Sequence, residues 1–146
     1  MKLAVDSSSF AKRYVQEVGS DKLDRLLQSA SELAFCVILV PEIVSGLNRR
    51  LREGVFTITD YRAVKKQLLD DVRDATVLQV TPSAVSRSVK LLESNVLRAL
   101  DALHVACALE WEADLFVTSD RRQFEAAMNT GLRTEYVGEP DVSTDG

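Results

Sequence analysis

The 146-residue sequence predicts an α/β protein, a three-layer α/β/α sandwich with a central, mostly parallel sheet of four to five strands. Three observations lead to this fold. Short apolar runs alternate with longer stretches that have the apolar spacing of amphipathic helices. Ser, Thr or Pro stands where several of these stretches begin. The composition, 46% hydrophobic and 27% charged, is that of a globular protein and is too apolar for a disordered chain.

The first half of the sequence starts this alternation. Strands are expected over 3–5 and 33–37, and helices over 7–14, from Ser20 onward and over 38–53. Ser7 and Ser20 suit the caps of the first two helices, because a serine hydroxyl can accept a hydrogen bond from a free N–H of the first turn. Gly54 suits the end of the third helix.

The second half continues the pattern. Helices are expected from Thr59 to Asp74, over 82–93, over 97–111 and around 124–128, and strands over 76–80, 115–117 and 134–137. Strands separated by helices pair in parallel through right-handed crossovers. The length favours one domain over residues 1–138, followed by a flexible tail over 139–146.

Four carboxylates stand at equivalent places in this pattern. Asp6 and Asp120 follow two of the expected strands, and Glu42 and Asp101 lie in the first turns of two expected helices. Ligands of open parallel sheets bind beyond the carboxyl ends of the strands, where the returning helices begin. We therefore expect the four acids to converge on one site. An all-oxygen site suits Mg²⁺, with Mn²⁺ as a substitute.

Each acid also has a simpler interpretation. Asp6 and Asp120 can merely cap a turn or a helix, and Glu42 can merely stabilise a helix N-terminus. Asp101 is different, because its sequence neighbours are almost all apolar and an unpaired carboxylate among them is costly.

Further residues near the acids are candidates for supporting roles. His104 stands one turn after Asp101, where it can hydrogen-bond that carboxylate, act as a base or fill the core. Ser7, Thr118 and Ser119 are interpreted mainly as helix caps, and otherwise as contacts to a metal-bound water or a phosphate. A local basic rim can be formed by Lys12, Arg13, Arg49, Arg50, Arg52, Arg121 and Arg122, although a solvated helix face explains each of them nearly as well. The net charge of −4 disfavours binding of a polyanionic substrate, so such a substrate requires a local basic rim beside the site.

The remaining features limit the setting. Cys36 and Cys107 lie in apolar surroundings and are expected to be buried, unpaired core residues. The first apolar run stops at Asp6 without the long apolar segment of a signal peptide, and no apolar stretch is long enough to span a bilayer. A cytoplasmic protein with no membrane partner is expected.

Taken together, four segments resemble those of PIN-domain ribonucleases, specifically the VapC-type toxins of type II toxin–antitoxin pairs. The segments are VDSSSFAKRYV, PEIVSGLNRRL, LRALDALHVACAL and LFVTSDRRQF. The resemblance implies a PIN-like fold, RNA as substrate, a cognate antitoxin as partner and a homodimer. It also implies Asp6 and Asp101 as direct metal ligands, with Glu42 and Asp120 binding directly or through water. One departure is that no Ser or Thr opens the helix that carries Glu42.

Two other functions stay open at this point. An aspartate-based phosphotransfer protein also places acids after parallel strands, but Ser8 stands where a phosphatase would carry a second acid. A PIN-like binding module that has lost activity is the other alternative, and the presence of all four acids weakens it.

Overall fold

The computed structural model describes residues 1–140 and shows five strands and seven helices in this range. The strands are β1 (Lys2–Val5), β2 (Glu32–Cys36), β3 (Thr76–Leu78), β4 (Leu115–Thr118) and β5 (Thr134–Tyr136). The helices are α1 (Ser7–Ala11), α2 (Ser20–Ser29), α3 (Leu39–Arg52), α4 (Ile58–Asp74), α5 (Pro82–Ser94), α6 (Ala99–Glu110) and α7 (Arg121–Asn129). All four strand pairings are parallel, in the order β3-β2-β1-β4-β5, so the predicted fold class is confirmed.

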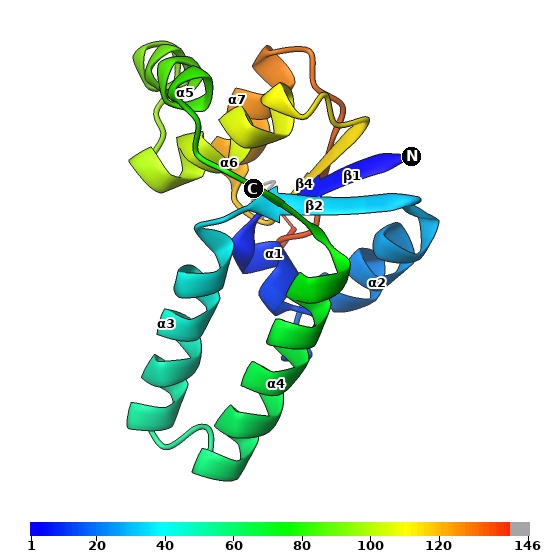
Figure 1. Ribbon diagram of the computed structural model, residues 1–146, viewed down its shortest axis with the longest axis vertical. Helices are drawn as coiled ribbons and strands as arrows, with labels where there is room; N and C mark the ends of the chain where they lie inside the picture. Colours follow the sequence, from blue (N-terminus) through cyan, green and yellow to red (C-terminus); the bar gives the residue numbers. More distant parts are fainter. Residues whose placement is uncertain (141–146) are drawn as a thin grey trace, which may run out of the picture.

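The helices cover both faces of this sheet (Figure 1). Because strand side chains alternate between faces, Leu3 and Val5 pack with Phe10 of α1 on one side, together with α2, α3 and α4. Ala4 packs on the other side, against the small and aliphatic residues of α5, α6 and α7. The low polarity of α6 follows from its place, since six of its residues are buried.

Three predicted helix caps were wrong. The carboxylate of Asp6, and not a serine, caps α1, and Thr57, two residues before the expected Thr59, caps α4 in a reciprocal box with Asp60. Gly19 stands at the cap of α2 with φ +91°, and a Cβ there would collide with the carbonyl oxygen of Val137. The hydroxyl of Ser20 donates to the carbonyl of Lys12 instead.

Other boundaries differ by a few residues. The first helix ends at Ala11, where three successive backbone hydrogen bonds to the third residue before replace the rest of the expected helix. Strand β3 is two residues shorter than expected. Cys36 and Cys107 are buried and unpaired, as predicted. Residues 141–146 of the expected tail lie outside the described residues. None of the helices in residues 1–140 is long and apolar enough to cross a membrane.

Candidate active site

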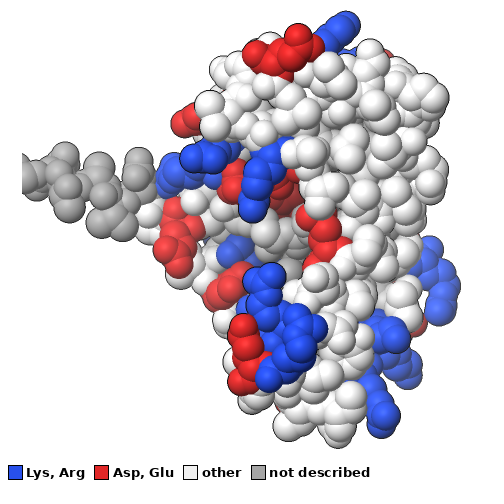
Figure 2. Space-filling model, turned by 90° about the vertical axis from the view of Figure 1, so that its left-hand side faces the viewer, with Lys and Arg blue, Asp and Glu red and all other residues white. Residues whose placement is uncertain are grey.

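The four acids lie at the carboxyl edge of the sheet. Asp6 joins β1 to α1 and Asp120 joins β4 to α7, and these two strands are neighbours. Glu42 and Asp101 lie in the first turns of α3 and α6, which begin at the same edge. Figure 2 shows Asp and Glu side chains around a hollow on this side of the molecule, with Lys and Arg side chains above and below it.

Asp6 is the most enclosed of the four acids, with 3% of its surface exposed. Its Oδ1 accepts the backbone N–H of Ser9 at 2.9 Å, and its Oδ2 accepts the hydroxyls of Thr118 at 2.8 Å and Ser8 at 3.2 Å. A carboxylate has about four acceptor positions, so these bonds leave room for one further partner. Thr118 and Ser8 therefore fix the carboxylate, and Thr118 is not a helix cap.

Asp120 caps α7 through Oδ1, which accepts the N–H of Gln123 at 2.9 Å. Gln123 is fully buried, and its Nε2 donates to the carbonyl of Asp101 at 3.0 Å, which joins α7 to α6. The Thr118 hydroxyl has one proton, which serves either Asp6 or the Gln123 Oε1 at 2.6 Å. We did not single out Gln123 in the sequence, because a glutamine at the third position of a helix is an ordinary cap partner.

Ser119 lies at the rim of this network rather than at a helix cap. Its hydroxyl exchanges a hydrogen bond with that of Ser8 at 2.7 Å and accepts one from Ser9 at 3.3 Å. These bonds join the loop after β4 to the start of α1, so the two strand ends that carry acids are held together.

Asp101 faces the hollow beside Arg98, whose Nε lies 3.3 Å from Oδ2 of the carboxylate. Burial raises the pKa of Asp101, the negative charges of Asp120 and Asp6 raise it further, and Arg98 opposes them. Asp101, Asp120, Arg98, Arg121 and Arg122 line one pocket of about 370 Å³. Arg98 was missed in the sequence analysis. An Arg three residues before an Asp at a helix start indicates that the two side chains can pair, so the sequence did contain a sign of this contact.

Glu42 lies in a second group, with Ser7 and His104. Its Oε1 is 2.6 Å from Nε2 of His104 and accepts the Ser7 hydroxyl at 3.0 Å. His104 thus contacts an acid of α3 rather than Asp101 on its own helix. Burial lowers the pKa of His104, but the Glu42 hydrogen bond and the charges of Asp6 and Glu42 outweigh burial and raise it. Burial raises the pKa of Glu42 in turn, and the bonds from His104 and Ser7 outweigh that effect and lower it.

The expected basic rim is divided by the fold. Arg121 and Arg122 line the acidic pocket, whereas Lys12 is buried against Glu17, and Arg13 pairs with Asp71 of α4 at 2.9 Å. The arginines of α3 lie farther along that helix, in its last turn. The structure therefore brings Asp101 and Asp120 together with Arg98, Arg121 and Arg122, and it places Arg13 elsewhere.

Comparison with known proteins identifies the family. A model of the PIN domain matches residues 3–128. The chain belongs to the PIN domain family. None of the curated proteins matches the sequence.

Solved structures share the fold of this PIN domain. A toxin–antitoxin complex from Klebsiella pneumoniae matches at 14% identity and a TM-score of 0.64, covering 84% of this chain and 89% of that one. VapBC2 from Rickettsia felis, bound to a DNA fragment from its promoter, matches at 13% and 0.65, covering 93% and 98%. Mycobacterium tuberculosis VapC20, described as a sarcin-ricin loop cleaving toxin, matches at 18% and 0.65, covering 85% and 94%.

The acids of this PIN domain suit a hydrated divalent ion. Within residues 1–140, no three His, Cys, Asp or Glu side chains are already arranged as a closed metal-binding group. Mg²⁺ does not need such a group, because it keeps several waters and binds one or two carboxylates together with substrate phosphate. The carboxylates of Asp101 and Asp120 line one pocket. Burial, together with the negative charges of Asp120 and Asp6, raises the pKa of Asp101, and a cation would offset both effects.

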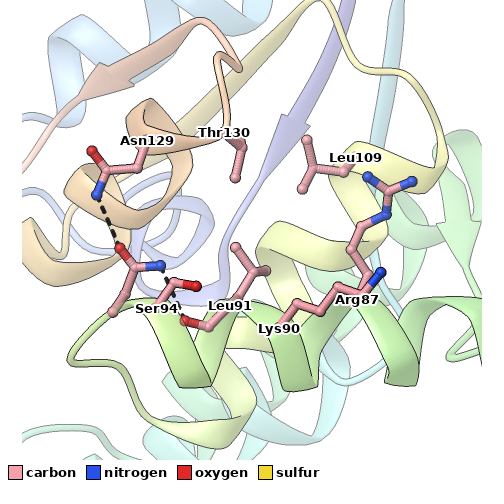
Figure 3. A pocket seen from close by; sticks show the side chains of 8 residues that line it. Arg87, Lys90, Leu91, Ser94, Leu109, Asn129 and Thr130 are labelled. Atoms are coloured by element: carbon pink, nitrogen blue, oxygen red, sulfur yellow. Dashed lines mark hydrogen bonds between the residues drawn. The ribbon is translucent and has the colours of Figure 1, made fainter.

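A separate hollow of about 290 Å³ lies between α5, α6 and α7 (Figure 3). Leu91 and Leu109 line it, and an amide chain closes one side, in which Asn129 bonds to Asn95 and Asn95 to the carbonyl of Leu91. Arg87 at its rim is paired with Glu110 at 3.0 Å. No carboxylate lines this hollow, so it is distinct from the acid site.

Proposed function

We propose that this PIN domain is a metal-dependent endoribonuclease, the toxin of a type II toxin–antitoxin pair, which hydrolyses phosphodiester bonds of RNA. One observation carries the proposal: a single pocket holds Asp101 and Asp120 beside Arg98, Arg121 and Arg122. The carboxylates suit a divalent cation, and the guanidinium groups suit a phosphate. A phosphodiester substrate needs both.

The residues have distinct roles in this proposal. Asp6 and Asp101 would hold Mg²⁺, or Mn²⁺ in its place, and Glu42 and Asp120 would bind it directly or through water. The bound ion would lower the pKa of a water molecule and stabilise the negative charge that develops on the phosphate. Thr118 and Ser8 hold Asp6 in place, and Ser7 and His104 hold Glu42. Arg98, Arg121 and Arg122 bind and orient the phosphate.

The test combines metal titration with RNA cleavage. Wild-type protein should bind Mn²⁺ by calorimetry and cleave RNA in Mg²⁺, and a chelator should abolish cleavage. Asp101→Asn should lose both properties, whereas the matched control Asp70→Asn, in an exposed pair with Arg73 on α4, should keep them. If the wild type binds no Mg²⁺ or Mn²⁺ at millimolar concentration, the alternative of a PIN-fold binding module replaces this proposal.

The partner proposed for the site is a cognate antitoxin, since two of the structural matches are described as assemblies of this kind. Its blocking segment would cover the acids, with an Arg among the carboxylates. Coexpression with the product of the gene adjacent to that of this protein should yield a complex in which RNA cleavage is inhibited. A complex that leaves cleavage unchanged would contradict the blocking role.

We also propose that a second copy of the chain covers the outer face of α5. Val85, Val89 and Leu92 form an exposed stripe at helical spacing on α5, and Val96 follows just beyond the end of the helix; the four side chains are 37–73% exposed. Figure 2 shows a wide uncharged surface in the upper part of the molecule, at the height of α5. Val89→Glu should convert a dimer to a monomer in light scattering. The matched change Leu69→Glu, at an equally exposed position of α4, should leave the dimer intact.

A further inference from the structure

The arginines in the last turn of α3 lie on the same helix as Glu42, which makes them candidates for a longer RNA contact. α3 begins at the acid site and runs away from the sheet beside α4 (Figure 1). Ser45, Arg49 and Arg52 follow Glu42 at spacings of three, four and three residues, which places all four on one side of the helix, within about 80° of arc. A continuous strip of α3 therefore leads from the acid site to two arginines.

The strip is open along its length. Glu42 and Ser45 line a shallow groove of about 440 Å³ with Ile38, Pro41 and Leu100. Arg49 and Arg52 continue in the same direction. Both are exposed, and neither forms a side-chain hydrogen bond or an ion pair with any residue in the range 1–140.

Arg50, between these two arginines in the sequence, is placed differently. Arg50 lies on a different side of α3, is partly buried, and holds its guanidinium over the ring of Phe56 at 5.7 Å. Arg49 and Arg52 have no such partner within the described part of the chain, although the overall composition is acidic. Two unpaired guanidinium groups at a fixed spacing suit a repeating anion.

The spacing matches an RNA backbone. With a rise of 1.5 Å per residue, Arg49 lies about 10 Å and Arg52 about 15 Å along α3 from Glu42. A stacked strand advances about 3.4 Å per phosphate, so these arginines reach phosphates about three and four nucleotides from one at the acids. Arg98, Arg121 and Arg122 line the acid pocket itself. Figure 2 shows Lys and Arg side chains both above and below the hollow.

We propose that α3 is an RNA-backbone track, in which Arg49 and Arg52 bind phosphates on one side of the cleaved bond. The proposal rests on the ribonuclease function proposed above and adds a footprint of several nucleotides to it. Arg49 and Arg52 bind the strand without touching the reacting phosphate, so they determine affinity and the position of cleavage along the strand.

The first experiment measures binding of an unstructured RNA by anisotropy over a series of salt concentrations, in Mg²⁺ and in an Asp101→Asn background that prevents cleavage. Arg49→Ala and Arg52→Ala should each reduce the slope of log K against log salt by about 0.7, the value for one phosphate contact of a single strand. The matched controls are Arg25→Ala on α2, on the other side of the molecule, and Arg133→Ala, at the amino end of β5, and both should leave the slope unchanged. Equal losses in the arginine and control variants would overturn the track.

The second experiment separates the track from the catalytic chemistry. With a long RNA, Arg49→Ala/Arg52→Ala should raise KM severalfold at unchanged kcat, and with a dinucleotide too short to reach α3 the difference should vanish. Wild-type protein that cleaves RNA and a double variant with unchanged KM would overturn the track and leave the proposed function intact. If RNA binding depends on both arginines but the wild type cleaves no RNA, the track stands and the proposed ribonuclease function is wrong.

Two controls complete the design. Basic residues in the last turn also stabilise a helix, so the thermal unfolding of each variant is measured. Arg49→Lys and Arg52→Lys keep the positive charge and should bind RNA with most of the wild-type affinity. If the double variant binds RNA normally but no longer binds the antitoxin, α3 contacts an acidic protein segment and the RNA track is wrong.

Discussion

Asp6 and Asp101 lie at the same edge of the sheet, and the fold treats the two carboxylates in opposite ways. Asp6 is buried and accepts three hydrogen bonds from Ser8, Ser9 and Thr118. Asp101 has Arg98 as its side-chain partner among the described residues, and burial and neighbouring negative charges raise its pKa.

The difference separates structural from functional use of an acid. The simple interpretation of Asp6 and Asp120 as helix caps is true, and it does not exclude a second role as ligands. Asp101 caps nothing, and its charge costs free energy in the absence of a cation. Stability and activity should therefore respond differently to substitutions at the two positions.

The largest effect is expected for Asp101→Asn. Cleavage should fall by about 100-fold or more, because a metal ligand contributes several kcal/mol to the transition state. The free energy of unfolding should stay within about 0.5 kcal/mol or rise, since a repelled charge is removed. Urea unfolding and RNA cleavage measure the two quantities. If Asp101→Asn lowered both RNA cleavage and the free energy of unfolding, Asp101 would be a structural residue like Asp6.

Asp6→Ala is expected to destabilise the fold by about 2 kcal/mol, because it removes the cap of α1, leaves the N–H of Ser9 without its acceptor and takes one acceptor from the Thr118 and Ser8 hydroxyls. Asp6→Asn keeps one acceptor oxygen and should cost less. Urea midpoints of both variants, compared with Asp101→Asn, measure the difference. Equal stabilities of Asp6→Ala and wild type would show that the network around Asp6 is not structural.

His104→Gln should weaken Mn²⁺ binding by roughly tenfold, as expected when a residue that orients a ligand is lost. The raised pKa of His104 also predicts a pH effect. The folded state holds this proton more tightly, so the stabilising charged pair with Glu42 is complete below pH 6.5 and is lost as pH rises through the raised pKa. The free energy of unfolding of His104→Gln should not change with pH over that range. If it changed with pH as in the wild type, another group would be responsible for the pH dependence.

The smallest effect is expected for Arg98→Ala. Arg98 is 81% exposed, so its ion pair with Asp101 should contribute less than about 0.5 kcal/mol to stability. Because Arg98 opposes the rise in the pKa of Asp101, its removal should raise that pKa further. Carboxyl chemical shifts followed over pH measure the change, with Arg133→Ala as the control. A fall in the pKa would show that Arg98 does not act on this carboxylate.

The periodicity of the sequence was sufficient to predict the parallel sheet, because alternation of short apolar runs and amphipathic stretches is a local property that packing preserves. The same order placed Asp6, Asp120, Glu42 and Asp101 at one edge, since strand ends and helix starts meet there. Their positions after expected strands and in the first turns of expected helices already marked them as candidates.

Side-chain partners across the fold depended on the tertiary structure. His104 contacts Glu42, 62 positions away, rather than Asp101 on the same helix, and Arg13 turns to Asp71 of α4 rather than to the acids. Such choices depend on how helices pack side by side, which periodicity does not encode. The sequence by itself determined which elements carry the acids. Only the packing decided which acids are held by hydrogen bonds and which one is left facing the hollow.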